Sequence, residues 1–240
     1  MLTGTIVNTC TVIAGSVLGM LLGNILPERL RDTVMKGLGL CTIFIGITGM
    51  FGSENALITI ISIAVGAIIG ELCDLDGHLN RFANRLESRF KRKEGAGKAT
   101  IAEGFITASL VFCVGAMTIV GSLNAGLTGD YEMLLTKSVL DLISSAMLSV
   151  SLGIGVMFAA VFVLVFQGGI VLLAGVLQPL LTAAAINEIV CAGSLLIVGL
   201  GLNLMGIAKI KVADYLPAIV IAPILCAIIQ AVPALSAFFG

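Results

Sequence analysis

The chain has little histidine and few charged residues, the types on which many catalytic and metal sites depend. It has no tryptophan, one histidine (His78) and only 11% charged residues. The HExxH, GxSxG and GxxxxGK(S/T) motifs of metalloproteases, serine hydrolases and P-loop NTPases are absent. One histidine cannot build a histidine-rich metal site, and His78 lies in a polar loop between apolar runs. We therefore expect no enzyme, no metal centre and no cofactor.

Redox and nucleic-acid chemistry are also poorly supported. The chain has six cysteines: Cys10, Cys41, Cys73, Cys113, Cys191 and Cys226. No two of them have CxxC spacing, so we expect small buried hydrophobic residues and not a redox pair. The formal net charge is only −1, and the basic residues gather mainly in one loop. We expect no nucleic-acid partner.

Apolar residues dominate what is present, at 58% of the chain with a mean hydropathy of +1.15. A helix needs roughly 20 apolar residues to cross the ~30 Å core of a bilayer. The apolar runs predict an all-α, polytopic helical bundle, one transmembrane domain over 1–240, whose partner is the lipid bilayer. Eight spans are expected, with Gly153 and Gly155 separating the fifth from the sixth: 4–23, 33–51, 56–73, 103–121, 134–152, 155–176, 188–207 and 216–238. Seven spans, with 121–137 as a re-entrant segment, is the alternative.

The basic residues predict the orientation. With eight spans and the N-terminus outside, 12 of the 13 lysines and arginines face the cytoplasm, as the positive-inside rule requires. Lys137 is the exception. The first ten residues contain no Lys or Arg, so we expect the first span to be retained and not cleaved as a signal peptide.

One hydrophilic segment, 74–102, interrupts the spans. Within it Leu79, Phe82, Leu86 and Phe90 repeat at helical spacing beside a row of arginines. This pattern favours a basic amphipathic helix on the anionic cytoplasmic leaflet. The alternative is a solvated linker that only sets the topology.

A faint internal repeat relates the two ends of the chain. Residues 39–47 align without gaps onto 192–200, at an offset of 153, and spans 1–3 match spans 6–8 in length. Five spans separate the copies, so the repeat would be inverted, an arrangement typical of secondary transporters. Chance alignment of glycine- and leucine-rich helices is the alternative.

The fifth span carries a polar stripe. Lys137, Asp141, Ser145 and Ser149 are spaced four residues apart and would share one helix face. Ionisable residues inside a membrane indicate a functional site. A Lys–Asp pair and serines that only hold helices together are the other reading.

The segment before it, GSLNAGLTGD (121–130), is rich in glycine and polar residues. Each glycine inside a helix costs about 1 kcal/mol, so we expect this segment to be unwound. If it dips into the membrane, Ser122, Asn124 and Thr128 could coordinate an ion or polar solute. If it stays at the surface, it is an ordinary turn.

Small-residue ladders in the first and third spans indicate close helix packing: Gly15, Gly19, Gly23, Gly66 and Gly70. Such faces also favour a homodimer. Asn8 and Asn203 are isolated amides inside apolar spans. We expect each to make an interhelical hydrogen bond, with the lining of a solute pathway as the alternative.

Four stretches resemble a known family: residues 8–23, 66–77, 112–141 and 203–218, of which FCVGAMTIVGSLNAGLTGDYEMLLTKSVLD (112–141) is the most specific. The chain is similar over essentially its whole length to the uncharacterised bacterial family called domain of unknown function 554. The resemblance implies a multi-pass protein of the bacterial plasma membrane, described only loosely as a transport protein. It implies no substrate and no catalytic residues.

These observations favour a transporter or channel-like protein that binds and moves a small ion or polar solute. Asp141 would be the charge centre and Lys137 its partner. Asn8, Ser122, Asn124, Thr128 and Ser145 would complete the binding site. A non-transporting membrane scaffold or assembly subunit, whose polar residues are structural, is the alternative.

Overall fold

The described part of the chain is helical, with no β-strand. The computed structural model describes residues 2–25, 27–52, 55–78, 80–81, 100–179 and 181–231. The elements are α1 (Thr3–Ile25), α2 (Glu28–Met50), α3 (Ala56–Leu72), α5 (Ile101–Cys113), α6 (Ala116–Leu127), α7 (Glu132–Leu152), α8 (Ile154–Leu172), α9 (Ala174–Leu177), α10 (Ala183–Leu204), the 3₁₀ turn η1 (Val212–Tyr215) and α11 (Pro217–Ala231). The all-α class is confirmed, whereas most of the amphipathic segment expected within 74–102 lies outside the described residues.

Six of these helices are long and apolar enough to cross a bilayer: α1, α2, α7, α8, α10 and the η1–α11 segment. The bent pair α5 and α6 makes a seventh if it counts as one span. Helix α3 is apolar but has only 17 residues. The chain is therefore a multi-pass membrane protein with six to seven candidate spans.

Helix boundaries follow local chemistry. The side chains of Asn55, Thr100 and Thr182 accept hydrogen bonds from backbone N–H groups in the first turns of α3, α5 and α10. Gly153, with φ of 65°, ends α7 and starts α8. This backbone angle is readily adopted by glycine alone, so the break predicted there is confirmed.

Glycines bring α1 against α7 along their whole length. A Cβ on Gly15, Gly19 or Gly23 would collide with α7: with Ser145 Oγ, the Ala146 carbonyl and the Val150 carbonyl, respectively. Gly4, at the start of α1, faces Leu134 at the start of α7. The two helices therefore run side by side in the same direction.

Other helix pairs use the same device. Gly39 of α2 and Gly201 of α10 face each other's backbones, and Gly66 and Gly70 of α3 face Ala218 and Asp214. The prediction that the small-residue ladders are packing faces is confirmed. The homodimer stays a prediction, but these faces no longer argue for it, because they are occupied within one chain.

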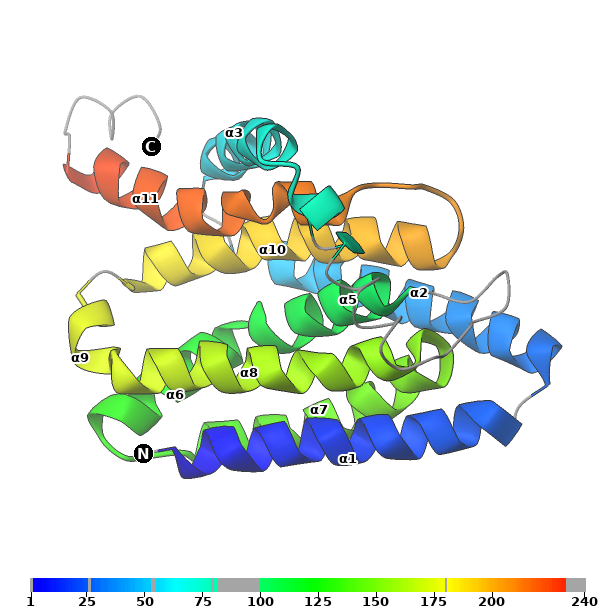
Figure 1. Ribbon diagram of the computed structural model, residues 1–240. Helices are drawn as coiled ribbons and strands as arrows, with labels where there is room; N and C mark the ends of the chain where they lie inside the picture. Colours follow the sequence, from blue (N-terminus) through cyan, green and yellow to red (C-terminus); the bar gives the residue numbers. More distant parts are fainter. Residues whose placement is uncertain are drawn as a thin grey trace.

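The helices form an elongated bundle (Figure 1). Helices α1 and α7 lie along one side, α3 and α11 along the opposite side, and α8, α5 and α10 between them. One apolar core of α1, α5, α7 and α8 centres on Val12, Phe112, Leu148 and Val163. Large apolar side chains such as Phe44, Leu72 and Val165 cover the outside, as expected for helices in contact with lipid.

The close approach of α1 to α7 predicts that the effect of a glycine-to-alanine substitution on stability depends strongly on its position. We expect Gly19→Ala to lower the stability by about 1–3 kcal/mol, because its Cβ would push against the Ala146 carbonyl. Gly37→Ala in α2 is the matched control. Its Cβ would meet nothing within 4 Å, so stability should stay the same or rise by up to about 1 kcal/mol. Thermal unfolding in detergent measures both variants, and equal effects would contradict the packing argument.

Candidate functional site

A buried ion pair lies on α7. Lys137 Nζ donates to both carboxylate oxygens of Asp141, at 2.8 Å to Oδ1 and 2.7 Å to Oδ2. The two side chains are only 8% and 6% exposed. Ser145 and Ser149 continue the same buried face. The predicted polar stripe is therefore a real face of α7 turned into the bundle.

Asn8 of α1 joins this pair. Its Nδ2 donates to Asp141 Oδ2 at 3.0 Å, and the residue is fully buried. This confirms the interhelical hydrogen bond expected for Asn8. Ser145, one turn beyond Asp141, lies against Gly15 of α1 and donates to the Leu142 carbonyl at 3.1 Å. The structure thus brings together Asn8, Lys137 and Asp141, with Ser145 adjacent.

The helix break predicted at 121–130 is in the wrong place. Residues 121–127 continue α6, and only 128–131 form a turn before α7, with Gly129 at φ of 77°. The re-entrant segment at 121–137 stays an alternative, because the bent pair α5–α6 fits either a broken span or a re-entrant loop. The break comes earlier, at Val114 and Gly115, where α5 and α6 meet at 60°. Helix packing outweighs the modest helix penalty of Gly121 and Gly126, which lie against Leu134 and Val171.

The break between α5 and α6 is stabilised by an extended residue and a side-chain hydrogen bond. Gly115 has extended backbone angles (φ −124°, ψ 145°), and the Thr118 hydroxyl donates to the Phe112 carbonyl at 2.8 Å across the gap. Non-helical backbone at membrane depth is tolerated only where it is buried in protein or lines a cavity. Here it lines a pocket that opens to the outside of the bundle, since Ile45 and Leu140 in the same lining are 43% and 52% exposed.

This cavity of about 510 Å³ adjoins the ion pair. Lys137 and Asp141 line it, as do the break at Val114 and Gly115 and four hydroxyl side chains, Thr48, Thr118, Ser144 and Ser194. The walls come from α2, α5, α6, α7 and α10. The volume falls within the range of pockets that hold small molecules, roughly 300–1,000 Å³.

The other predicted residues lie on α6 and in the turn that follows it. Ser122 is fully buried and its hydroxyl has no partner among the described residues. Asn124 is half-buried, and Thr128 is exposed with its hydroxyl donating to the Asn124 carbonyl at 2.8 Å. None of the three is among the residues that line the cavity. Their role in solute binding stays a prediction.

Glu188 and Gln167 are among the buried polar residues that sequence reasoning missed. Glu188 of α10 is 2% exposed and accepts a hydrogen bond from Thr59 at 3.3 Å, so Asp141 is not the only deeply placed acid. Gln167 of α8 is fully buried. Both could have been found as isolated polar residues within apolar spans, by the criterion that selected Asn8.

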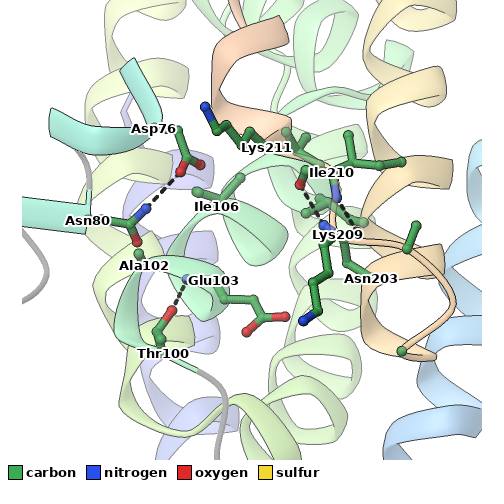
Figure 2. A pocket seen from close by; sticks show the side chains of 14 residues that line it. Asp76, Asn80, Thr100, Ala102, Glu103, Ile106, Asn203, Lys209, Ile210 and Lys211 are labelled. Carbon is green, nitrogen blue, oxygen red and sulfur yellow. Dashed lines mark hydrogen bonds between the residues drawn. The ribbon is translucent and has the colours of Figure 1, made fainter. Parts of the chain in front are cut away.

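A second pocket, of about 600 Å³, lies where α5 begins and α10 ends (Figure 2). The side chains of Glu103 and Lys209 point toward one another in it. Asn203 makes two 2.8 Å hydrogen bonds to the backbone of Ile210 and so holds the loop after α10. The interhelical bond predicted for Asn203 is therefore wrong. Burial, followed by repulsion from Asp214, raises the pKa of Asp76 in this pocket.

The apolar helices, the broken helix and the buried ion pair together define a multi-pass helical membrane protein with a polar interior. The chain belongs to the family described as "Protein of unknown function (DUF554)", which matches residues 3–227. It is 34% identical to the "Uncharacterized membrane protein YdfK" of Bacillus subtilis (strain 168), over 95% of this chain and 97% of that protein. It is 32% identical to the "Uncharacterized protein YqgA" of Escherichia coli (strain K12), over 92% and 95%. No solved structure matches the chain.

The ion pair predicts non-additive mutational effects. Lys137→Met or Asp141→Leu alone should lower stability by about 3–5 kcal/mol, because each leaves an unpaired buried charge. The double variant should recover most of this loss, because apolar side chains can replace a buried pair with little change in stability. Thermal unfolding of the four proteins in detergent measures the coupling. Simple additivity would show that the two charges do not depend on one another.

Proposed function

We propose that this protein is a membrane transporter or channel-like protein that binds and moves a small ion or polar solute. One observation carries the proposal: a cavity, a broken helix and a buried ion pair meet at one place between α2, α5, α6, α7 and α10. Broken helices beside charged groups are how many transporters bind polar solutes within the membrane.

The chemistry of the cavity suits such a solute. Lys137 and Asp141 offer both signs of charge, and the hydroxyls of Thr48, Ser144 and Ser194 offer donors and acceptors. The ion pair is a weak stabiliser compared with apolar residues of similar size, so its presence favours a functional role. Asp141 is the charge centre of the proposed site, with Lys137 and Asn8 as its partners.

The directions of the helices support eight crossings, whereas length and composition alone give six to seven candidate spans. Gly4 faces Leu134 and Gly23 faces Val150, so α1 and α7 are parallel. Two parallel spans start on the same side of the membrane, so the chain must cross an even number of times between their starting points. The elements from α1 up to the start of α7 must therefore cross an even number of times.

The bent pair α5–α6 follows α8 along its length, from Gly104 beside Gly155 to Gly126 beside Val171. It therefore crosses together with α8. With α1, α2 and this bent pair as three crossings, α3 as a fourth gives the even number. We therefore propose eight crossings, with α3 as a short span.

The helix pairs also support the inverted repeat. The offset of 153 residues carries α1, α2 and most of α3 onto α8, α10 and the η1–α11 segment. Each of these helices packs against its own counterpart. Gly39 faces Gly201 while Gly49 faces Ser194, so the α2–α10 pair is antiparallel, as an inverted repeat requires. Pairwise contact of counterparts is expected around a pseudo-two-fold axis in the membrane plane.

A scaffold or assembly subunit remains the second candidate function. The observation that favours it is the complete pairing of the Asp141 carboxylate, which accepts from Lys137 at both oxygens and from Asn8. In that case the ion pair and Asn8 would only fix how α1 and α7 meet. The two functions make different predictions for a folded variant that lacks the Lys137–Asp141 pair. A transporter should lose its transport activity, whereas a scaffold should keep its function.

The eight-crossing topology predicts which surface positions are accessible from each side. In a background without the six native cysteines, single cysteines at Phe51 and Thr128 should react with an impermeant thiol reagent in intact cells. Cysteines at Arg81 and Ile207 should react only after permeabilisation. All four positions are exposed, so burial does not limit labelling. Labelling of Phe51 and Arg81 from the same side would show that α3 does not cross.

The transport proposal predicts loss of activity in variants that keep the fold. Solute-evoked currents in proteoliposomes should be tested with a panel of alkali cations, halides, amino acids and small carboxylates. Lys137→Met/Asp141→Leu should fold and show no current. Gly115→Leu should also fold and block the current, because a Cβ there meets nothing within 4 Å and the residue lines the cavity.

Gly169→Leu is the matched control, because its Cβ also meets nothing within 4 Å and Gly169 is not among the residues that line the cavity. This variant should retain the native current. Absence of current with every solute in the native protein would favour the scaffold. Native currents in the double variant would show that the pair is structural only.

A further inference from the structure

Four helices carry buried polar side chains with apolar residues on either side, and on α1, α7 and α8 these apolar residues belong to the same two cores. On α1, Thr5 and Asn8 lie between Leu2 and Val12; on α8, Gln167 lies between Val171 and Val163. On α7, Ser138 and Asp141 lie between Leu134 and Leu148, and on α6, Ser122 lies between Ala125 and Ile119. The same order of apolar and polar residues therefore occurs on each helix.

Backbone contacts put these polar positions at one level. Gly126 of α6 faces Val171 of α8, so Ser122, one turn earlier, comes level with Gln167, one turn before Val171. A Cβ on Gly168 would lie 3.9 Å from Thr5 Cγ2, which brings α1 to the same level. Asn8 then reaches α7 through its hydrogen bond to Asp141.

Several polar atoms of this layer have no partner among the described residues. They are Thr5 Oγ1, Asn8 Oδ1, Ser122 Oγ and both Oε1 and Nε2 of Gln167, and all four residues have 0% exposure. A buried polar group without a hydrogen bond is costly, and more so where lipid surrounds the bundle. A single ligand at this level would satisfy several of these five atoms at once.

We propose that Thr5, Asn8, Ser122 and Gln167 form a binding site for a dehydrated alkali cation. Four of the five atoms are neutral oxygens, which are ligands for hard cations. Asn8 has an oxygen available for this role: its Nδ2 donates to Asp141, while its Oδ1 has no partner among the described residues. Gln167 Nε2 can donate to a water molecule that accompanies the ion.

The charge of the layer selects a monovalent ion. Calcium and magnesium sites in proteins rely on carboxylates, and the one carboxylate here, Asp141, is neutralised by Lys137. No group of three or more His, Cys, Asp or Glu residues in the described part of the chain could hold a metal ion. The apolar group Leu2, Ala125, Leu134 and Val171 covers the layer on one side and would exclude bulk water.

This inference rests on the proposed transport function, in which the cation would be the coupling ion of the Asp141 site. Asn8 provides the link, because the same amide bonds to the carboxylate and would bind the ion. A cation bound at the proposed site would thereby change the strength of the hydrogen bond from Asn8 to Asp141.

The test is the melting temperature of the purified protein in lipid nanodiscs, in NaCl, KCl or LiCl against choline chloride at constant ionic strength. We expect at least one alkali cation to raise the melting temperature, with a shift that grows with the logarithm of its concentration. Gln167→Leu and Thr5→Val should weaken the apparent affinity by at least ~10-fold. Both replace an unpartnered polar group by an apolar one of similar size, so the fold should persist.

Thr107→Val is the matched control. Thr107 of α5 is also fully buried with an unpartnered hydroxyl but is not part of the layer, and its variant should respond like the native protein. No cation-specific shift in the native protein would overturn the site, and so would equal shifts in native protein, Gln167→Leu and Thr5→Val. Solute currents that persist without a cation response would reject this site alone and leave the transport function standing.

Discussion

The structure depends on one constraint: inside a bilayer, polar groups must find partners within the protein. Backbone groups meet it by forming helices, and the Asp141 carboxylate meets it by accepting from Lys137 and Asn8. The break at Gly115 meets it in part through the Thr118 hydroxyl. At the break, a pocket of about 510 Å³ leaves space beside the ion pair.

Glycine contacts decide which polar groups meet. Because Gly15 and Gly19 let the backbones of α1 and α7 come together, the short side chain of Asn8 can reach Asp141. Larger residues at these glycines would separate the helices and leave the carboxylate with one partner fewer. Stability and site geometry therefore depend on the same small residues.

The two polar regions of the interior differ in how well they are satisfied. The Lys137–Asp141 pair is fully bonded, whereas Gln167 has no partner among the residues described. Asn8 belongs to both regions. A ligand that enters either region would act on the other through this amide, which is the kind of differential contact that coupled binding requires.

Much of the fold could be predicted from the sequence. Apolar runs specify helices in a membrane, the four-residue spacing of Lys137, Asp141, Ser145 and Ser149 specifies one buried face, and Gly153 specifies a break. These are local properties, because helix periodicity is a property of neighbouring residues. The second partner of Asp141 was not local. Asn8 lies 133 residues away, and periodicity shows which face of a helix is polar but not which helix it meets. The position of the broken helix was decided by packing as well. Glycines at 121 and 126 remain helical against α7 and α8, while Gly115 lines a cavity. A helix penalty of about 1 kcal/mol per glycine is small compared with the packing of whole helices, so only the tertiary structure could decide between them.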